Sequence, residues 1–256
     1  MPDNHLNINR DHWNRDAPHW VAEGEKLWAA TVPVWGIWGL PEHDLTLLPK
    51  DMAGQNAIEL GCGTGYVSGW MARRGARVTG IDLSDRQLAT ARRLAQDHGA
   101  DIRLIEGNAE ATGLPDASFD FAISEYGAAI WCDPHVWLAE AHRLLRPGGR
   151  LVFLGHHPLV ILCTPDEGLT CDRALHRPYR DMRSEDWTND PEDPGGIEFN
   201  LGIADWLALF GDLGFMVERY QELYAPVGAQ GSHFGISADW SRDYPCEQVW
   251  HLQKPG

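Results

Sequence analysis

The chain has 256 residues, of which 43% are hydrophobic and 23% charged, a composition typical of a soluble globular protein with room for a substantial core. Its formal net charge of −16 argues against nucleic acid as a partner, because binding to phosphates normally depends on Lys and Arg. The sequence contains no apolar run of about 18 residues, so it predicts no membrane span. Its polar N-terminal stretch also lacks a secretory signal, and we therefore expect a cytoplasmic protein.

The cysteines give no sign of a disulfide framework or a zinc site. They are odd in number, and no two of them form a C-x-x-C pair. Scattered reduced thiols are therefore the better interpretation, and we predict no metal site. The five positions are Cys62, Cys132, Cys163, Cys171 and Cys246.

Residues 1–49 are expected to form a helical lead-in that is rich in tryptophan. Trp13, Trp20 and Trp28 recur at spacings of seven and eight residues, which places them on one face of a helix. This pattern leaves two interpretations open. The indole rings pack in the core, or some of them form walls of a ligand pocket.

From residue 56 onward, short apolar strands alternate with helices. Strands are predicted over 56–61, 76–83, 102–107, 119–124 and 151–155, and helices over 66–74, 84–99 and 133–150. Ser84 is expected to cap the second of these helices, and Gly99 to end it. The third is expected to close at Pro147-Gly148-Gly149. Alternation of this kind indicates an α/β fold in which helices cover both faces of a mostly parallel sheet.

The regular pattern stops at residue 156. Residues 156–200 carry five prolines and many charges, which predicts an irregular cap insertion of the kind that forms lids or binding loops. A helix over 203–215, a strand over 215–224 and a final antiparallel strand over 247–254 follow. No linker divides the chain, so we expect one domain over 1–256, with a core at 56–155 and the C-terminal part of the sheet in 201–256.

A glycine-rich turn lies between the first predicted strand and its helix. In AIELGCGTG, Gly61, Gly63 and Gly65 occupy alternate positions, and glycines at such a turn let the backbone approach a nucleotide closely. The dinucleotide fingerprint requires glycine at 66, where this chain has Tyr66, and the P-loop motif is absent. Asp82 stands 21 positions after Gly61, near the place of a carboxylate that binds ribose hydroxyls.

Four segments together resemble the class I S-adenosylmethionine-dependent methyltransferases. They are AIELGCGTG, VTGIDLS, EGNAEATGLPDASFDFAIS and EAHRLLRPGGRLVF, and they lie within about 55–155, with a weaker likeness over 203–224. The resemblance implies a Rossmann-like three-layer sandwich, a seven-stranded sheet whose last strand is antiparallel, and S-adenosyl-L-methionine as the cofactor. The segments PVWGIWGLPE, SEYGAAIWCDP and DWSRDYPCEQVW are also similar to an actinobacterial-type branch of small-molecule methyltransferases.

The resemblance implies a set of cofactor contacts. The backbone of the glycine turn would pass under the methionine portion, Asp82 would accept the ribose hydroxyls, and Leu83 would cover the adenine. Asn108 stands where aspartate is commonest, and its carbonyl oxygen can still accept a hydrogen bond. Glu59 either contacts the cofactor or only ties down the turn. The full set is Trp13, Trp20, Glu59, Gly61, Cys62, Gly63, Gly65, Asp82, Leu83, Gln87, Asn108, Ala109, Glu110 and Glu125.

Methyl transfer from a sulfonium is an in-line displacement, so the protein mainly aligns the acceptor and excludes water. A general base is needed only where the acceptor must lose a proton. We predict three candidates near the ends of the fourth and fifth strands: Tyr126, His156 and His157. A magnesium-dependent site is not favoured, because histidines stand after the fifth strand in place of carboxylates.

The acceptor pocket is expected to come from the insertion and from residues 225–246. Aromatic walls with a few polar groups suit a small, partly flat organic molecule, with oxygen as the leading target atom. Nitrogen, sulfur or carbon acceptors and a non-catalytic cofactor-binding protein remain alternatives, and either a monomer or a homodimer is expected. The predicted acceptor-site residues are Trp131, His176, Trp187, His233 and Phe234.

Overall fold

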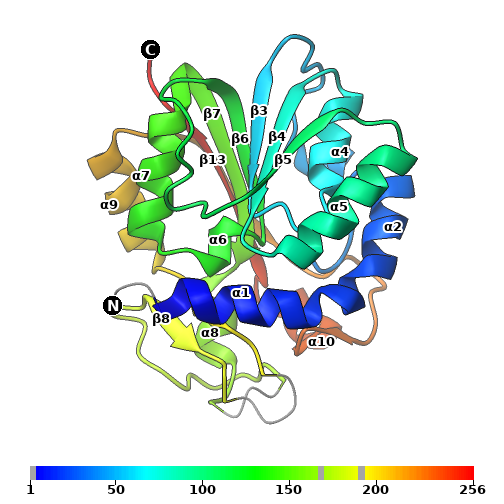
Figure 1. The fold of residues 1–256 in the computed structure, drawn as a ribbon. Helices are drawn as coiled ribbons and strands as arrows, with labels where there is room; N and C mark the ends of the chain where they lie inside the picture. The colour runs from blue at the N-terminus through cyan, green and yellow to red at the C-terminus, as the bar shows by residue number, and fades with distance from the viewer. Residues whose placement is uncertain (1–3, 167–169, 190–193) are drawn as a thin grey trace.

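A seven-stranded mixed sheet forms the centre of the computed structural model, which describes residues 4–166, 170–189 and 194–256 (Figure 1). The strand order is β10-β13-β7-β6-β3-β4-β5, and all neighbours are parallel except β13, which is antiparallel to both β7 and β10. The predicted antiparallel last strand is therefore confirmed. The strands are β3 (Asn56–Leu60), β4 (Arg77–Asp82), β5 (Ile102–Glu106), β6 (Phe119–Glu125), β7 (Leu145–His156), β10 (Met216–Leu223) and β13 (Glu247–Gln253).

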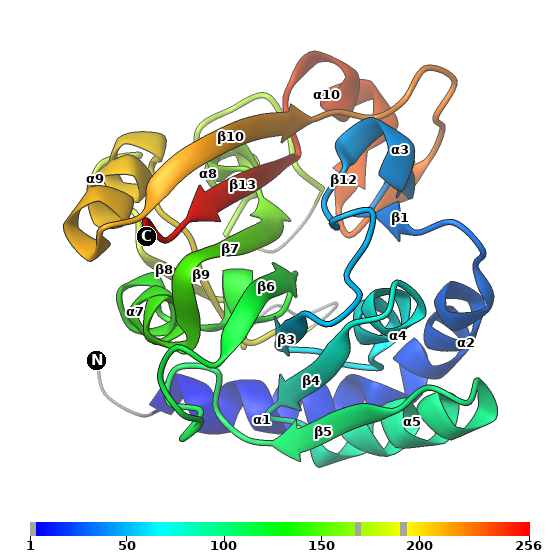
Figure 2. The same ribbon diagram turned by 90° about the horizontal axis from the view of Figure 1, so that it is seen from above.

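Helices cover both faces of the sheet because its buried strands carry apolar side chains on both sides. Ala122 packs in one core cluster, whereas its neighbours Phe121 and Ile123 pack in the other, as the two-residue period of a strand requires. Figure 2 shows the resulting layers, and they confirm the predicted sandwich. The first face is covered by α7 (Pro134–Leu144) and α9 (Ile203–Leu213), and the second by α4 (Tyr66–Arg73), with α5 (Asp85–Asp97) and α2 (Val21–Ala29) beside it.

The N-terminal lead-in is not one continuous helix. A short 3₁₀ turn, η1 (Ala17–Trp20), contains Pro18 and separates α1 (Asn4–Asp16) from α2. The three spaced tryptophans therefore do not share one continuous helix face. Trp28 is a core residue that donates a hydrogen bond to the Thr64 carbonyl at 2.9 Å. A small hairpin of β1 (Val34–Trp35) and β2 (Leu40–Pro41) follows, and then α3 (Glu42–Leu45).

The predicted helix over 133–150 is too long. After the short α6 (Ala128–Trp131), α7 ends at Leu144, and residues 145–150 begin β7. Leu145 has an extended backbone and pairs with Phe119 of β6. Pro147 also cannot donate the backbone hydrogen bond that a continuing helix needs, so the Pro-Gly-Gly segment lies inside the strand.

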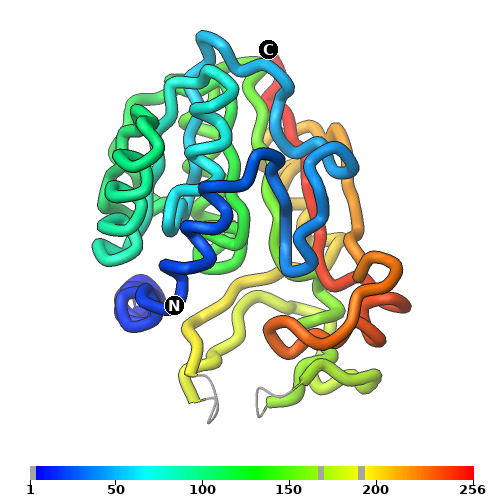
Figure 3. The backbone as a smooth tube through the Cα atoms, turned by 90° about the vertical axis from the view of Figure 1, so that its right-hand side faces the viewer, coloured from blue at the N-terminus to red at the C-terminus, as the bar shows by residue number. Residues whose placement is uncertain are grey.

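The segment 156–200 is less irregular than predicted. It contains α8 (Pro158–Cys163) and the pair of β8 (Ser184–Asp186) and β9 (Ile197–Phe199), while residues 167–169 and 190–193 lie outside the described part. Nearer the C-terminus, β11 (Ser232–His233), β12 (Ile236–Ser237) and α10 (Ala238–Asp243) form a second small unit. Figures 1 and 3 show that these segments and α1 lie together at one end of the sheet.

Two further sequence expectations concern membranes and cysteines. Among the described residues, no helix combines the length and the apolar character needed to cross a bilayer. All five cysteines are buried as free thiols.

Candidate functional site

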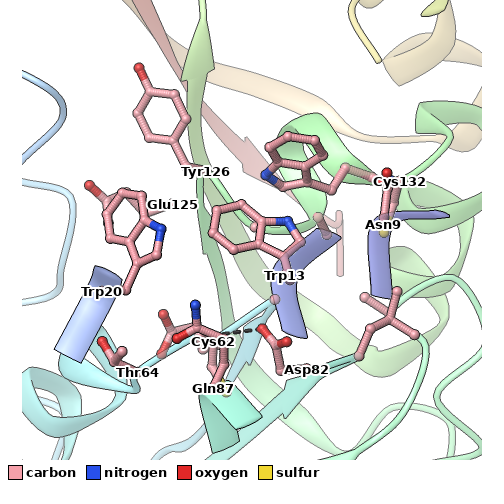
Figure 4. Close-up of a pocket in the computed structure, with 18 of the residues that line it drawn as sticks. Asn9, Trp13, Trp20, Cys62, Thr64, Asp82, Gln87, Glu125, Tyr126 and Cys132 are labelled. Atoms are coloured by element: carbon pink, nitrogen blue, oxygen red, sulfur yellow. Dashed lines mark hydrogen bonds between the residues drawn. The ribbon is translucent and has the colours of Figure 1, made fainter. Parts of the chain in front are cut away.

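A pocket lies between the carboxyl ends of β3, β4 and β6 on one side and α1 and η1 on the other. The space between its lining atoms measures about 830 Å³, including open solvent at the mouth. Figure 4 shows its main side chains. The lining residues are Asn9, Trp13, Trp20, Glu59, Gly61, Cys62, Gly63, Thr64, Tyr66, Asp82, Leu83, Gln87, Gly107, Ala109, Glu125, Tyr126, Gly127, Ala128, Trp131 and Cys132.

The glycine turn forms one wall of this pocket, and its backbone is left-handed at all three glycines. Gly61 has φ +77°, Gly63 +50° and Gly65 +77°. A Cβ atom on Gly61 would lie 2.6 Å from the Cα atom of Gly127, so the floor of the pocket tolerates no side chain there. Gly65 precedes α4 and lies outside the lining. The turn therefore presents bare backbone to a ligand.

Asp82 ends β4 and lies directly beside the glycine turn in the pocket lining (Figure 4). Its Oδ2 accepts a hydrogen bond from the Gly63 N–H at 2.7 Å, and its Oδ1 accepts one from the Ser84 N–H at 2.8 Å. Burial raises the pKa of the carboxyl, although backbone N–H groups favour its charged form. Each oxygen retains further lone-pair capacity, so the group can accept hydroxyls from a ligand while its orientation stays fixed.

Glu59 lines the pocket but is bonded toward α4. Its Oε2 accepts hydrogen bonds from the Ser68 N–H at 2.8 Å and from the Ser68 hydroxyl at 2.5 Å. The side chain is 2% exposed, and burial raises its pKa to about 8. These contacts connect α4 to β3 on either side of the glycine turn. Holding the turn in place was one of the two roles that the sequence left open for Glu59.

Aromatic rings form the opposite wall. The Trp13 ring lies 5.8 Å from the Trp20 ring and meets the Trp131 ring edge-on at 5.2 Å. Trp20 donates its indole N–H to Asp16 Oδ2 at 2.7 Å, which fixes the ring. Phe234 stacks on Trp20, with a centroid separation of 6.0 Å and nearly parallel planes. A flat cation or a sulfonium can be held against such indole faces.

Two adjacent residues at the end of β6, Glu125 and Tyr126, bring carboxylate and hydroxyl groups to the pocket. Glu125 Oε2 accepts a hydrogen bond from the Tyr66 hydroxyl, and its Oε1 accepts one from the Gly36 N–H at 3.1 Å. Burial raises the pKa of Glu125, and these two hydrogen bonds oppose the rise. A cationic group of a ligand would find here a fixed, water-poor acceptor.

Tyr126 has a left-handed backbone, with φ +55°, which is rare for an aromatic residue. Its hydroxyl donates to Glu247 Oε1 at 2.7 Å, and its ring meets His156 edge-on at 5.0 Å. In Figure 4 the ring extends away from Asp82 and Cys62. The ring and its hydroxyl thus extend away from the Asp82 carboxylate and toward Glu247.

Most of the cofactor residues predicted from sequence lie in the lining. The exceptions, apart from Gly65, are Asn108 and Glu110, which form a turn beside it. Asn108 Oδ1 accepts a hydrogen bond from the Glu110 N–H at 2.8 Å. Glu110 Oε1 accepts one from the Asp133 N–H at 2.7 Å and lies 2.8 Å from His5 Nε2. Of the other predicted residues, Tyr126 and Trp131 also line the pocket.

The two predicted catalytic histidines lie outside the lining. His157 Nδ1 accepts a hydrogen bond from the Leu159 N–H and caps α8, and burial lowers its pKa to about 4. His156 is enclosed, with Nδ1 3.6 Å from Glu198 Oε2. Burial opposes its charged form, but Glu198 and Glu247 raise its pKa. His157 is thus engaged in holding a helix, while His156 contacts the Tyr126 ring.

Four of the predicted acceptor residues also lie away from the pocket lining. His176 lies 3.0 Å from Asp172, and the Trp187 ring faces the Arg177 guanidinium. The remaining two belong to one hairpin, in which His233 packs on Trp38 and Phe234 packs on Trp20. Phe234 therefore reaches the pocket only through a lining residue.

Sequence reasoning missed Asn9, Thr64, Tyr66, Gly107, Gly127, Ala128 and Cys132, all of which line the pocket. Asn9 is fully buried and bonds the Trp131 carbonyl and both backbone groups of Ile197, so it ties α1 to the insertion. Gly127 is needed because a Cβ there would lie 2.2 Å from the Gly61 carbonyl oxygen. The close approach of Gly127 to Gly61 becomes visible only in the folded sheet.

No group of three or more His, Cys, Asp or Glu side chains in the described ranges is arranged to hold a metal ion.

Comparison with known proteins gives the same picture as the geometry. Residues 58–153 match a family described as methyltransferase domain. A demethylmenaquinone methyltransferase of Thermus thermophilus is 36% identical over 113 residues, which are 43% of this chain and 51% of that protein. A malonyl-[acyl-carrier protein] O-methyltransferase of Pectobacterium atrosepticum is 40% identical over 114 residues, 44% of this chain and 42% of that protein. The chain thus spans about half the length of these curated relatives.

A solved structure extends the likeness to most of the chain. The S-adenosylmethionine-dependent methyltransferase from Mesorhizobium loti superposes with a TM-score of 0.63 and 25% identity, over 82% of this chain and 94% of the other. Residues 58–153 thus match a methyltransferase domain, and the sheet order, the glycine turn and the fold as a whole are similar to those of a solved S-adenosylmethionine-dependent methyltransferase.

Proposed function

We propose that this protein transfers the methyl group of S-adenosylmethionine to an oxygen atom of a small organic acceptor. The observation that carries the proposal is a single pocket with two chemically different sides. One side is the glycine turn with Asp82, and the other is the aromatic wall with Tyr126. The first suits a nucleoside, and the second suits a flat organic molecule.

The residues of the first side fit the cofactor. Gly61 leaves a backbone cradle that a Cβ would fill, and Asp82 is held by two N–H groups with capacity left for hydroxyls. We propose that Glu125 receives the ammonium group, because its carboxylate is buried and already fixed by Tyr66 and Gly36. When bound, the cofactor supplies a methyl group on a sulfonium, a leaving group that needs no activation by the protein.

Trp13 and Trp20 are proposed to exclude water above the sulfonium. Their rings lie in contact with each other in the lining, and an indole face attracts a cation. Excluding water favours an in-line displacement by an aligned acceptor over hydrolysis. The protein itself thus binds the two reactants, orients them and excludes water from the site.

The acceptor is proposed to enter beside Trp131 and Tyr126. These residues offer an apolar ring and a hydroxyl at the end of β6. An oxygen acceptor is supported by the proton-accepting groups behind Tyr126, and an O-methyltransferase is among the relatives. The likeness of three segments to an actinobacterial-type branch also favours a small-molecule acceptor. We further propose a monomer or a homodimer.

The proposal is tested with cofactor labelled at the methyl group and a panel of phenols, carboxylic acids, amines and thiols. Label is expected in an ether or ester product of at least one hydroxyl acceptor. If label appears only in products methylated at nitrogen, sulfur or carbon, the target atom is not oxygen and that part of the proposal is wrong. Cofactor binding without transfer to any member would favour a non-catalytic binding protein.

A further inference from the structure

We propose that Tyr126 and Glu247 form a proton relay that deprotonates the acceptor hydroxyl. In this relay Tyr126 contacts the acceptor and takes its proton, while Glu247 takes the proton of the Tyr126 hydroxyl. The inference rests on the proposed function, since a relay is needed only if the acceptor loses a proton. It assigns a role to Glu247, which lies outside the pocket lining and 121 residues further along the chain.

Tyr126 connects the pocket lining to Glu247. It lines the pocket next to Glu125, and its hydroxyl donates to Glu247 Oε1 at 2.7 Å. Because that proton is directed at the carboxylate, the lone pairs of the tyrosine oxygen are left to accept a hydrogen bond from a ligand. The backbone strain at φ +55° is of the kind that functional sites retain when the surrounding structure enforces it.

Glu247 has the properties of an internal proton acceptor. Its side chain is fully buried at the start of β13, and Oε1 also accepts the Ile37 N–H at 2.9 Å. Its Oε2 is buried and has no hydrogen-bond partner. A buried carboxylate with an orphaned oxygen is costly unless the molecule uses it, and protonation relieves that cost. Burial raises the pKa of Glu247 to about 7, near the value suited to proton exchange at neutral pH.

The surroundings of Glu247 account for this balance. Glu125 faces it from the end of β6 and Tyr126 from the residue after that strand, His156 faces it from β7, and Cys246 precedes it in the chain. The negative charge of Glu125 raises the pKa of Glu247, while the Tyr126 hydrogen bond and His156 lower it. No other described carboxylate accepts a hydrogen bond from Tyr126.

His156 is better suited to supporting this pair than to acting as the base. Glu198 and Glu247 raise its pKa against the effect of burial, and His156 lies outside the pocket lining. Its ring packs edge-on against Tyr126 and helps to hold that ring in place. The histidine predicted from sequence thus becomes a positioning residue for the tyrosine.

The relay balances in protons and charge. The acceptor proton passes to the Tyr126 oxygen as the tyrosine proton passes to Glu247 Oε1, so tyrosine ends neutral. The acceptor oxygen forms its bond to the methyl carbon while the carbon–sulfur bond breaks and its electron pair stays on sulfur. A sulfonium and a carboxylate become a thioether and a carboxylic acid, and Glu247 later returns its proton to solvent.

The test compares Tyr126→Phe and Glu247→Gln with the wild-type protein on two acceptors. One is unsubstituted phenol, and the other is a nitrophenol that is largely ionised at about pH 8. We expect kcat with phenol to fall by about 10²-fold or more in both variants, the magnitude of a lost general base, and kcat with the nitrophenol to fall by less than about 3-fold. Matched controls are Tyr220→Phe and Glu218→Gln, a similar hydroxyl and carboxyl on β10 away from the pocket.

A readout without acceptor comes from carbon-13 NMR of the glutamate carboxyl groups. One signal is expected to titrate near pH 7, to be absent in Glu247→Gln, and to titrate at higher pH in Tyr126→Phe, because that variant loses the hydrogen bond that favours the charged form. An unmoved signal in Tyr126→Phe would show that the two groups are not coupled and would overturn the relay.

The kinetic outcomes separate the relay from the proposed function. If the wild-type protein methylates phenols and the variants match it, or lose both acceptors equally, the relay is wrong and the function stands. If the wild-type protein binds the cofactor but methylates no hydroxyl acceptor, both the oxygen target and the relay are wrong. Cofactor affinity measured by calorimetry is expected to stay within about 2-fold in both variants.

Discussion

Gly61 and Gly127 approach each other so closely at the pocket floor that neither position has room for a Cβ atom. The first glycine was predictable, because it belongs to a local motif with Asp82 at a fixed spacing. The second was not, since its requirement comes from a strand that is adjacent only in the folded sheet. The same holds for Tyr126 and Glu247, whose contact joins β6 to β13. Short-range patterns thus predicted the cofactor side better than the acceptor side.

Replacing Gly61 with alanine should abolish cofactor binding and lower stability. The new Cβ would lie 2.6–2.8 Å from the backbone of residues 127 and 128, in addition to the strain of a left-handed alanine. Gly113→Ala is the matched control, with φ +69° and open space around the site. Urea unfolding should show a loss of about 1–2 kcal/mol for the control and a larger loss for Gly61→Ala. Equal losses would contradict the clash.

At the scale of elements, the helices with clear caps were predicted well and the connecting segments poorly. Ser84 caps α5 as expected, by accepting a hydrogen bond from the Gln87 N–H at 3.1 Å. The strand after α7 was not foreseen to begin as early as residue 145, because its pairing with β6 is a tertiary contact. The order within 156–200 also depends on distant partners such as Asn9, which no local pattern reveals.

The attachment of α4 should make stability depend on pH through Glu59. Its pKa is raised to about 8 in the folded protein, so the neutral form stabilises the fold. That contribution is complete below about pH 4.5 and is lost as the pH rises toward 8. Glu59→Gln cannot ionise, and its amide oxygen can still accept the Ser68 N–H.

We therefore expect the stability of Glu59→Gln, relative to wild type, to increase by about 1 kcal/mol or more between pH 5 and pH 8. Denaturant unfolding of the ligand-free proteins at several pH values measures the difference. The exposed Glu218→Gln should show no such trend. Parallel pH profiles for Glu59→Gln and wild type would show that Glu59 is charged in the folded protein.

The hairpin of β11 and β12 should slow release of the ligand. Phe234 at its tip stacks on Trp20, a lining residue, and the contact of two aromatic rings contributes about 0.5–1.5 kcal/mol. Phe234→Ala is expected to raise the dissociation rate of the demethylated cofactor by about 2–10-fold in stopped-flow experiments. Val227→Ala, at a fully exposed position, is the control. An unchanged rate for Phe234→Ala would show that the stack does not restrain the pocket.

For the whole molecule, alternating strands and helices were enough to predict a parallel sheet with helices on both faces. The pattern near the C-terminus predicted an antiparallel last strand, the resemblance added the count of seven strands, and the structure confirms both. The aromatic side of the pocket is assembled from α1, η1 and the segment that follows β6, and no spacing in the sequence connects these segments. That is why the predicted residues His176, Trp187 and His233 lie away from the pocket, whereas Tyr126 lies in it.

The central claim is that this pocket binds S-adenosylmethionine with Asp82 on its ribose, and isothermal titration calorimetry tests it most directly. Wild-type protein should bind the cofactor at one site per chain and should not bind NAD. Asp82→Ala should bind about 10–100-fold more weakly, the cost of losing hydrogen bonds to a charged group. Glu218→Gln should bind like wild type. Tight binding of NAD, or equal affinity of Asp82→Ala and wild type for S-adenosylmethionine, would contradict the account.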